Sequence, residues 1–201
     1  MQSENHPSID WKAVAAVVLT TLILSVDHYR DLIPDFTWNS IFLYFVLPAL
    51  AIVLFFRQPL ADYGFRVGNW KLGLAASAVS MAAITALLPF VVRFEDFNQY
   101  YSTSTGPVLP FIAETAAGML GWEFFFRGFL LFALARVAGP YAILLQAVPF
   151  TLAHFGKPEL ETLSCIFGGS AFGWLAWRTK SFLYPFLIHT YLSVMIVLMA
   201  Q

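Results

Sequence analysis

The sequence predicts an all-α fold, a polytopic membrane helix bundle of about seven transmembrane helices. Of its 201 residues, 59% are hydrophobic and 11% are charged, and the mean hydropathy is +0.72. A soluble domain carries about a quarter charged residues. The 21 Phe, 8 Tyr and 6 Trp residues are more than one soluble core of this size can bury. We therefore expect an integral, multi-pass membrane protein.

The apolar runs predict where the helices lie. A bilayer core of about 30 Å needs roughly 20 apolar residues per helix. The seven stretches closest to this requirement are Trp11–Val26, Ser40–Phe56, Trp70–Val92, Val108–Ala135, Tyr141–His154, Leu160–Trp177 and Phe182–Ala200. The fifth is short and is either tilted or partly re-entrant. No internal repeat or long linker interrupts the chain, so residues 1–201 are interpreted as a single integral membrane domain.

The charges in the loops predict the orientation in the membrane. Basic residues mark cytoplasmic loops, and in a seven-span arrangement one side carries Arg57, Arg66, Lys71, Arg136, Arg178 and Lys180. The opposite loops carry Asp27, Asp31, Asp35, Glu95 and Asp96 against Arg30 and Arg93. We expect a cytoplasmic N-terminus, and a C-terminus on the far side if the fifth stretch crosses. The net charge of −1 gives no reason to expect nucleic acid, and one cysteine, Cys165, excludes an intrachain disulfide framework and a Cys-rich metal site.

Ionisable residues inside apolar helices are costly and usually functional. Glu123 and Arg127 lie four residues apart in GWEFFFRGFLL and share one helix face, so they can form an ion pair. This pair fits a structural role in helix packing and a functional role equally well. His154 ends the fifth apolar run, and His189 lies about two turns into the last span, with Ser193 one turn later. Two histidines and a carboxylate can hold a divalent metal or deprotonate a water.

Three motifs in order resemble those of the CPBP family of intramembrane metalloproteases. They are EFFFRG (Glu123 to Gly128), FTLAH (Phe150 to His154) and HTYLS (His189 to Ser193). The family includes type II CAAX prenyl endopeptidases and bacteriocin-processing or self-immunity (ABI) proteins, and its pattern is Glu-Glu-x-x-x-Arg, Phe-x-x-x-His and His-x-x-x-Asn. The segment Tyr63 to Gly73 is similar to the loop that often precedes this region, which places the family-like core at about residues 63–201.

The resemblance implies an intramembrane endopeptidase that hydrolyses a peptide bond of a membrane-associated protein or peptide. It carries over catalytic roles to Glu123, Arg127, His154 and His189, and it implies a divalent metal, most simply zinc, on His154 and His189. Two positions depart from the pattern: Trp122 stands where the family has its first Glu, and Ser193 stands where it has Asn. Ser193 keeps a hydroxyl that can stabilise an oxyanion.

The missing first Glu leaves the identity of the catalytic base open. Glu123 is the nearest carboxylate, and Glu159 and Glu161, just beyond His154, are alternatives if their turn folds back into the cavity. Acidic residues in a first helical turn also simply complement the helix dipole. The alternative reading is a non-catalytic relative that binds a membrane peptide or lipid, or acts as an immunity protein. The expected partners are membrane lipid and a peptide or lipidated protein substrate, and the expected location is the bacterial plasma membrane.

Overall fold

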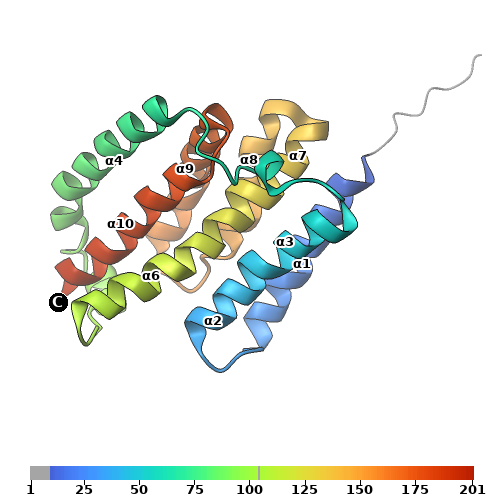
Figure 1. Ribbon diagram of the computed structural model, residues 1–201. Coiled ribbons are helices and arrows are strands. Elements are labelled where there is room, and N and C mark those ends of the chain that lie inside the picture. Colours follow the sequence, from blue (N-terminus) through green and yellow to red (C-terminus); the bar gives the residue numbers. More distant parts are fainter. Residues whose placement is uncertain (1–9, 104) are drawn as a thin grey trace, which may run out of the picture.

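The computed structural model describes residues 10–103 and 105–201, and within them the chain forms a bundle of helices with no strand (Figure 1). The predicted cytoplasmic N-terminus, residues 1–9, lies outside the described residues. The helices are α1 (Trp11–Tyr29), α2 (Phe36–Ile41), α3 (Leu47–Leu50), α4 (Trp70–Val91), α5 (Glu95–Tyr101), α6 (Val108–Glu123), α7 (Leu131–Ala138), α8 (Ala142–Leu152), α9 (Glu159–Thr179) and α10 (Leu183–Ala200).

Five helical stretches of the described chain are long and apolar enough to cross a membrane. They are Trp11–Tyr29, Phe36–Phe55, Trp70–Val91, Val108–Leu152 and Leu183–Ala200. The all-α membrane bundle is thereby confirmed, whereas the number of seven spans stays a prediction. The fourth stretch contains both the fourth and the fifth predicted spans. The sixth predicted span corresponds to α9, which begins with Glu159 and Glu161 and is not among the five.

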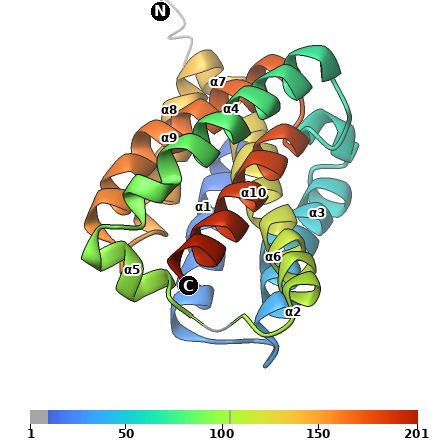
Figure 2. The ribbon, with the colours of Figure 1, turned by 90° about the vertical axis from the view of Figure 1, so that its left-hand side faces the viewer.

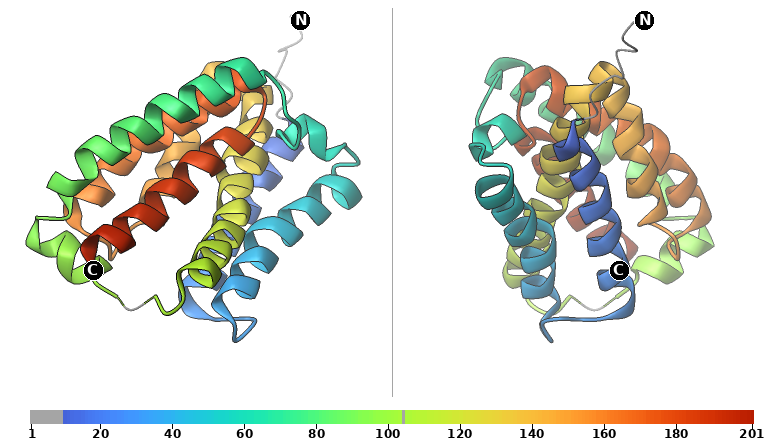
Figure 3. Two further views of the ribbon diagram at one scale, coloured as in Figure 1. Left: turned by 60° about the vertical axis from the view of Figure 1, so that its left-hand side comes forward. Right: turned by 90° about the vertical axis from the view of Figure 1, so that its right-hand side faces the viewer.

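The long helices run between two ends of the bundle, as Figures 2 and 3 show from other sides. One end holds the start of α1, the loop before α4, the turn between α7 and α8, and the turn between α9 and α10. Backbone hydrogen bonds join these segments, from Asn69 to Thr179 and from Phe182 to Gly64. The other end holds α5, the α1–α2 loop, the α8–α9 turn and the end of α10 (Figure 1).

Two helices of the bundle contain π-helical turns, which widen the helix by one residue per turn. Phe42–Val46 and Ala51–Phe55 lie on either side of Pro48, whose missing N–H interrupts the regular hydrogen-bond pattern. Phe124–Leu130 lies between α6 and α7, and all seven of its residues are buried. Such turns occur frequently at functional sites. This one lies in the middle of the Glu123–Arg127 motif.

Close packing around the buried π-helical turn is expected to make Gly128 intolerant of a larger side chain. A Cβ atom on Gly128 would lie 2.8 Å from Cδ2 of Phe124 and 2.9 Å from the backbone oxygen of Tyr63. Gly128→Ala should therefore lower the free energy of unfolding by about 1–3 kcal/mol, the usual cost of overpacking. Gly168→Ala is the control, because a Cβ atom there meets nothing within 4 Å. Thermal unfolding in detergent measures both variants, and equal melting temperatures would contradict the packing described here.

Candidate active site

The site contains the ion pair between Glu123 and Arg127 that the sequence predicted. Nη1 of Arg127 lies 3.1 Å from Oε1 of Glu123, and both side chains are fully buried. The second carboxylate oxygen of Glu123 and two guanidinium nitrogens of Arg127, Nε and Nη2, have no hydrogen-bond partner among the described residues. Burying opposite charges in contact reduces the electrostatic cost that either would have alone. The pair is therefore a fixed feature of the interior.

Aromatic rings provide the remaining contacts of the Arg127 guanidinium. Its Cζ lies 3.8 Å from the centroid of the Phe150 ring and 5.4 Å from that of Phe172. A cation over an aromatic face is attracted by the ring quadrupole, and more strongly where water is excluded. Phe150 belongs to α8 and Phe172 to α9, so Arg127 ties three helices together around Glu123.

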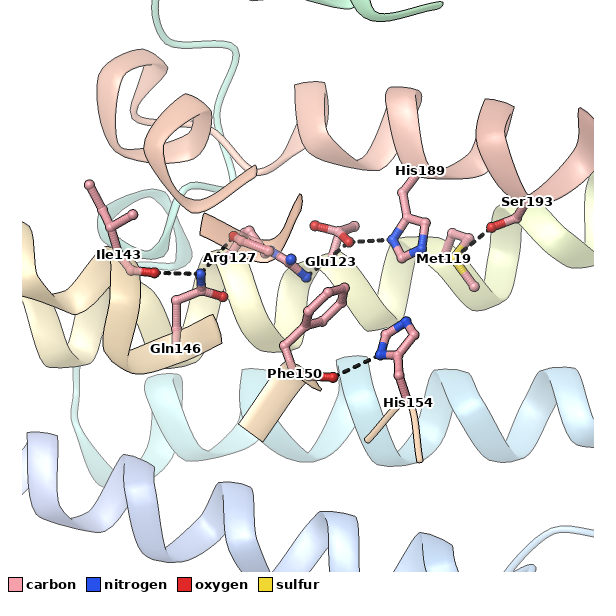
Figure 4. A network of polar contacts seen from close by, with 10 residues as sticks. Met119, Glu123, Arg127, Ile143, Gln146, Phe150, His154, His189 and Ser193 are labelled. Carbon is pink, nitrogen blue, oxygen red and sulfur yellow. Dashed lines mark hydrogen bonds and ion pairs between the residues drawn. The ribbon is translucent and has the colours of Figure 1, made fainter. Parts of the chain in front are cut away.

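His189 on α10 contacts the same carboxylate oxygen as Arg127. Its Nδ1 lies 2.6 Å from Oε1 of Glu123 (Figure 4). An ionised carboxylate only accepts hydrogen bonds, so Nδ1 of His189 carries the proton and donates it. In the neutral imidazole the other nitrogen, Nε2, then has a free lone pair. Glu123 thus fixes both the orientation and the tautomer of His189.

His154 is held in the corresponding tautomer by the backbone. Its Nδ1 lies 2.7 Å from the backbone oxygen of Phe150, and a carbonyl oxygen also only accepts. Nε2 of His154 therefore has the free lone pair. Thr162 on α9 donates to the backbone oxygen of His154 at 2.8 Å and holds the turn in which this residue lies. Figure 4 shows the two imidazoles facing one another beside Glu123, with the Phe150 ring next to them.

Both histidines line one cavity of about 650 Å³. His154 and His189 are 4% and 8% exposed, so each is buried in the protein except toward this space. Ser193, one turn after His189, also lines it, and its hydroxyl donates to the sulfur of Met119 at 3.7 Å. A thioether is a weak acceptor, so this hydroxyl can turn toward a better one. The cavity therefore brings together His154, His189 and Ser193, while Glu123 contacts His189 from outside the lining.

The two alternative carboxylates are placed differently from Glu123. Glu161 lines the cavity, but Oε1 accepts from Lys157 at 2.9 Å and Oε2 accepts from the Tyr101 hydroxyl at 2.6 Å. Burial, and then the neighbouring Glu161 carboxylate, raise the pKa of Tyr101, so it stays protonated and donates. Glu159 is exposed and does not line the cavity. Glu123 is thus the one of the three carboxylates that contacts an imidazole.

Trp122 occupies the position at which the related motif has its first Glu. Its ring centroid lies 4.9 Å from that of Tyr44, 5.0 Å from that of Phe126 and 5.9 Å from that of His154. The indole N–H is buried without a hydrogen-bond partner among the described residues. Trp122 is not among the residues that line the cavity. An aromatic cluster therefore lies on this side of His154.

The side chains at the site determine whether it can hold the zinc that the resemblance implies. A catalytic zinc site uses three protein ligands and one open position. Among residues 10–103 and 105–201, no three His, Cys, Asp or Glu side chains come together in a way that could hold a metal ion. His154 and His189 offer two free nitrogens, but the nearby Glu123 oxygen already accepts from both Arg127 and His189. No third ligand lies beside the two imidazoles among the described residues, so the metal stays a prediction.

Comparison with known proteins identifies the region that contains this site. A family model described as type II CAAX prenyl endopeptidase Rce1-like matches residues 104–195. The match includes all three motifs and confirms the resemblance drawn from them, although it starts well after Tyr63, where the family-like core was expected to begin. No curated protein and no solved structure matched the chain.

Proposed function

We propose that this membrane protein is an intramembrane endopeptidase in which Glu123 and His189 form the catalytic base. The match of residues 104–195 to the Rce1-like model of type II CAAX prenyl endopeptidases, a family of proteases, supports the proposal. The observation that carries the proposal is the 2.6 Å contact between Nδ1 of His189 and Oε1 of Glu123. A carboxylate behind an imidazole orients the ring and stabilises its protonated form, as in other hydrolases.

The first step is the attack of a water on the scissile carbonyl carbon. A water between the two imidazoles donates one hydrogen to Nε2 of His189 and the other to Nε2 of His154, because both nitrogens are acceptors. His189 takes the first proton as the water oxygen forms its bond to carbon, and Glu123 stabilises the imidazolium that results. Arg127 pairs with Glu123 and balances the charge of its carboxylate. The carboxylate therefore acts through His189 and does not take the proton itself.

The second step is the breakdown of the tetrahedral intermediate. The hydroxyl of Ser193 turns from Met119 and donates to the oxyanion; a single donor of this kind contributes roughly 10²–10³-fold to the rate. The His189 imidazolium returns its proton to the leaving nitrogen, and the C–N bond breaks. The products are a carboxylic acid and an amine, which become a carboxylate and an ammonium when the acid passes its proton to the amine, and the site regains its starting protonation state.

The substrate in this proposal is a membrane-associated protein or peptide. Twelve of the residues that line the cavity are Phe, Leu, Ile, Val or Met, so its walls suit apolar side chains on either side of the cut bond. The site is buried within helices that lie in lipid, so a substrate reaches it from the membrane or from the open end of the cavity.

A reporter assay tests the proposal. Purified protein in detergent is incubated with a library of internally quenched apolar peptides, and hydrolysis is compared between wild type and His154→Ala. We expect measurable hydrolysis by wild type and a rate about 10²-fold lower in the variant, because His154 accepts the second hydrogen of the attacking water and so holds it in position. If both proteins are folded and equally inert, the peptidase proposal is wrong and the non-catalytic reading, binding of a peptide or lipid, takes its place.

A further inference from the structure

We infer that the cavity opens at the end of the bundle that faces away from the cytoplasm, so that the substrate is an extended apolar peptide segment presented from outside the cytoplasm. The part of this inference that concerns a substrate rests on the proposed function. The side on which the cavity opens rests on separate observations: the distribution of charge over the two ends, and the residues that line the cavity.

The first end of the bundle, here called the basic end, is rich in lysine and arginine. Hydrogen bonds join its segments, from Arg66 to the backbone oxygen of Lys180 and from Arg136 to Asp10. The Arg136 contact also lowers the pKa of Asp10. The charged residues of the described chain at this end are Lys12, Arg57, Arg66, Lys71, Arg136, Arg178 and Lys180, against Asp10 and Asp62.

The opposite end, here called the acidic end, has the reverse composition. Its segments also contact one another, since Tyr101 donates to Glu161, and Asn98 donates to the backbone oxygen of Ala200. The charged residues here are Asp27, Asp31, Asp35, Glu95, Asp96, Glu114, Glu159 and Glu161, against Arg30, Arg93 and Lys157. Of the charged residues in the described chain, only Glu123 and Arg127 belong to neither end, because they form the buried pair.

This asymmetry orients the bundle. Lysine and arginine near the ends of membrane helices are retained in the cytoplasm. The basic end therefore lies in the cytoplasm and the acidic end outside it. The structure strengthens the argument from sequence, because it brings loops that are far apart in the chain, such as those of Arg66 and Lys180, to one end through direct contacts.

The cavity opens at the acidic end. Its polar lining residues outside the site are Thr37, Glu114, Thr115, Tyr101, Lys157, Glu161 and Ser164, and these belong to the start of α2, the start of α6, α5 and the α8–α9 region. The cavity lining contains no described residue of the basic end. From this rim the cavity extends inward to His154, His189 and Ser193.

The depth and the walls of the cavity suit an extended apolar peptide. His189 and Val197, the first and last residues of α10 in the cavity lining, are eight positions apart, which is about 12 Å at a rise of roughly 1.5 Å per residue. An extended chain covers that depth with about four residues. Leu88, Val91, Phe97, Phe111, Ile196 and Val197 form apolar walls along the way. A cytoplasmic protein would meet the opposite, basic end of the bundle, where the cavity does not open.

Cysteine labelling of intact cells tests this inference without requiring activity. Cys165 is the one cysteine in the chain, so Cys165→Ser gives a cysteine-free background. Ser164→Cys, in the lining at the acidic end, and Asp96→Cys, on the exposed surface of the same end, are compared with Lys71→Cys at the basic end. A membrane-impermeant maleimide should label the first two in intact bacterial cells and Lys71→Cys only after permeabilisation. The reverse pattern would overturn the inference.

Competition by a peptide tests whether an extended apolar segment binds in the cavity. The competitor is an apolar reporter peptide that the wild type hydrolyses, added outside the cells at ten times its Kd. Because the bound peptide covers the cavity, it should slow the labelling of Ser164→Cys about tenfold. The labelling of Asp96→Cys should not change. If Ser164→Cys is labelled from outside and the peptide does not slow this labelling, the inference that the cavity binds an extended apolar peptide is wrong. If no peptide is hydrolysed by any folded form while the labelling pattern is as expected, the proposed function fails and the position of the opening stands.

Discussion

His189→Ala is expected to lower kcat/KM for a cleavable reporter peptide by about 10²–10⁴-fold, the range for loss of a general base. The reason is that Nε2 of His189 is the nitrogen that takes the proton from water, while Nδ1 is committed to Glu123 at 2.6 Å. Folding should change little, because Glu123 keeps its partner Arg127 at 3.1 Å. The measurement is hydrolysis by purified protein, with thermal unfolding recorded on the same sample.

His28→Ala is the matched control for this experiment. His28 lies in the last turn of α1, is exposed and does not line the cavity. Its loss should leave hydrolysis unchanged. A His189→Ala protein that remains folded and retains hydrolysis close to that of wild type would show that His189 is not the base, whatever the control does.

Arg127→Ala is expected to give the largest loss of stability, about 3–5 kcal/mol, the usual effect of removing one partner of a buried ion pair. The substitution leaves Glu123 ionised in an apolar interior and removes the contact over the Phe150 ring at 3.8 Å. Glu123→Gln should cost less, because the amide oxygen can still accept from Arg127 and His189. Melting temperatures in one detergent measure the difference.

Arg136→Ala is the control for this prediction. Arg136 also forms an ion pair, at 2.8 Å with Asp10, but both side chains are partly exposed to solvent. Exposed pairs contribute about 0–1 kcal/mol, so this variant should unfold close to the wild-type temperature. Comparable melting temperatures for Arg127→Ala and Arg136→Ala would mean that the Glu123–Arg127 contact does not stabilise the fold.

The sequence was sufficient for the membrane bundle and for the Glu123–Arg127 pair, because both depend on local patterns. Apolar runs give the long helices, and a spacing of four residues places two side chains on one helix face. Gly139, with a φ of +53°, and Pro140 lie where α7 ends, between the fourth and fifth predicted spans, while the division into two spans stays a prediction. The short helix α5 was not predicted, because its Glu-Asp-Phe-Asn-Gln sequence reads as a polar loop.

The partners of the site residues could not be predicted, because they depend on packing between distant helices. Glu123 and His189 are 66 positions apart, and Tyr101 and Glu161 are 60 apart. Motif order indicated that His154 and His189 belong together, but it could not show that one carboxylate oxygen serves both Arg127 and His189. It also could not show that the backbone oxygen of Phe150 fixes the tautomer of His154. These contacts move the proposed base from a carboxylate to an imidazole.

The unit formed by Glu123 and His189 is tested most directly by a double-mutant cycle. Hydrolysis is measured for wild type, Glu123→Gln, His189→Ala and the variant with both changes, each shown to be folded by its melting temperature. If Glu123 acts only through His189, the double variant should be no slower than His189→Ala alone, since residues that act as a unit are not additive. If the two losses instead multiply, Glu123 and His189 act independently, and the carboxylate–imidazole base proposed here is contradicted.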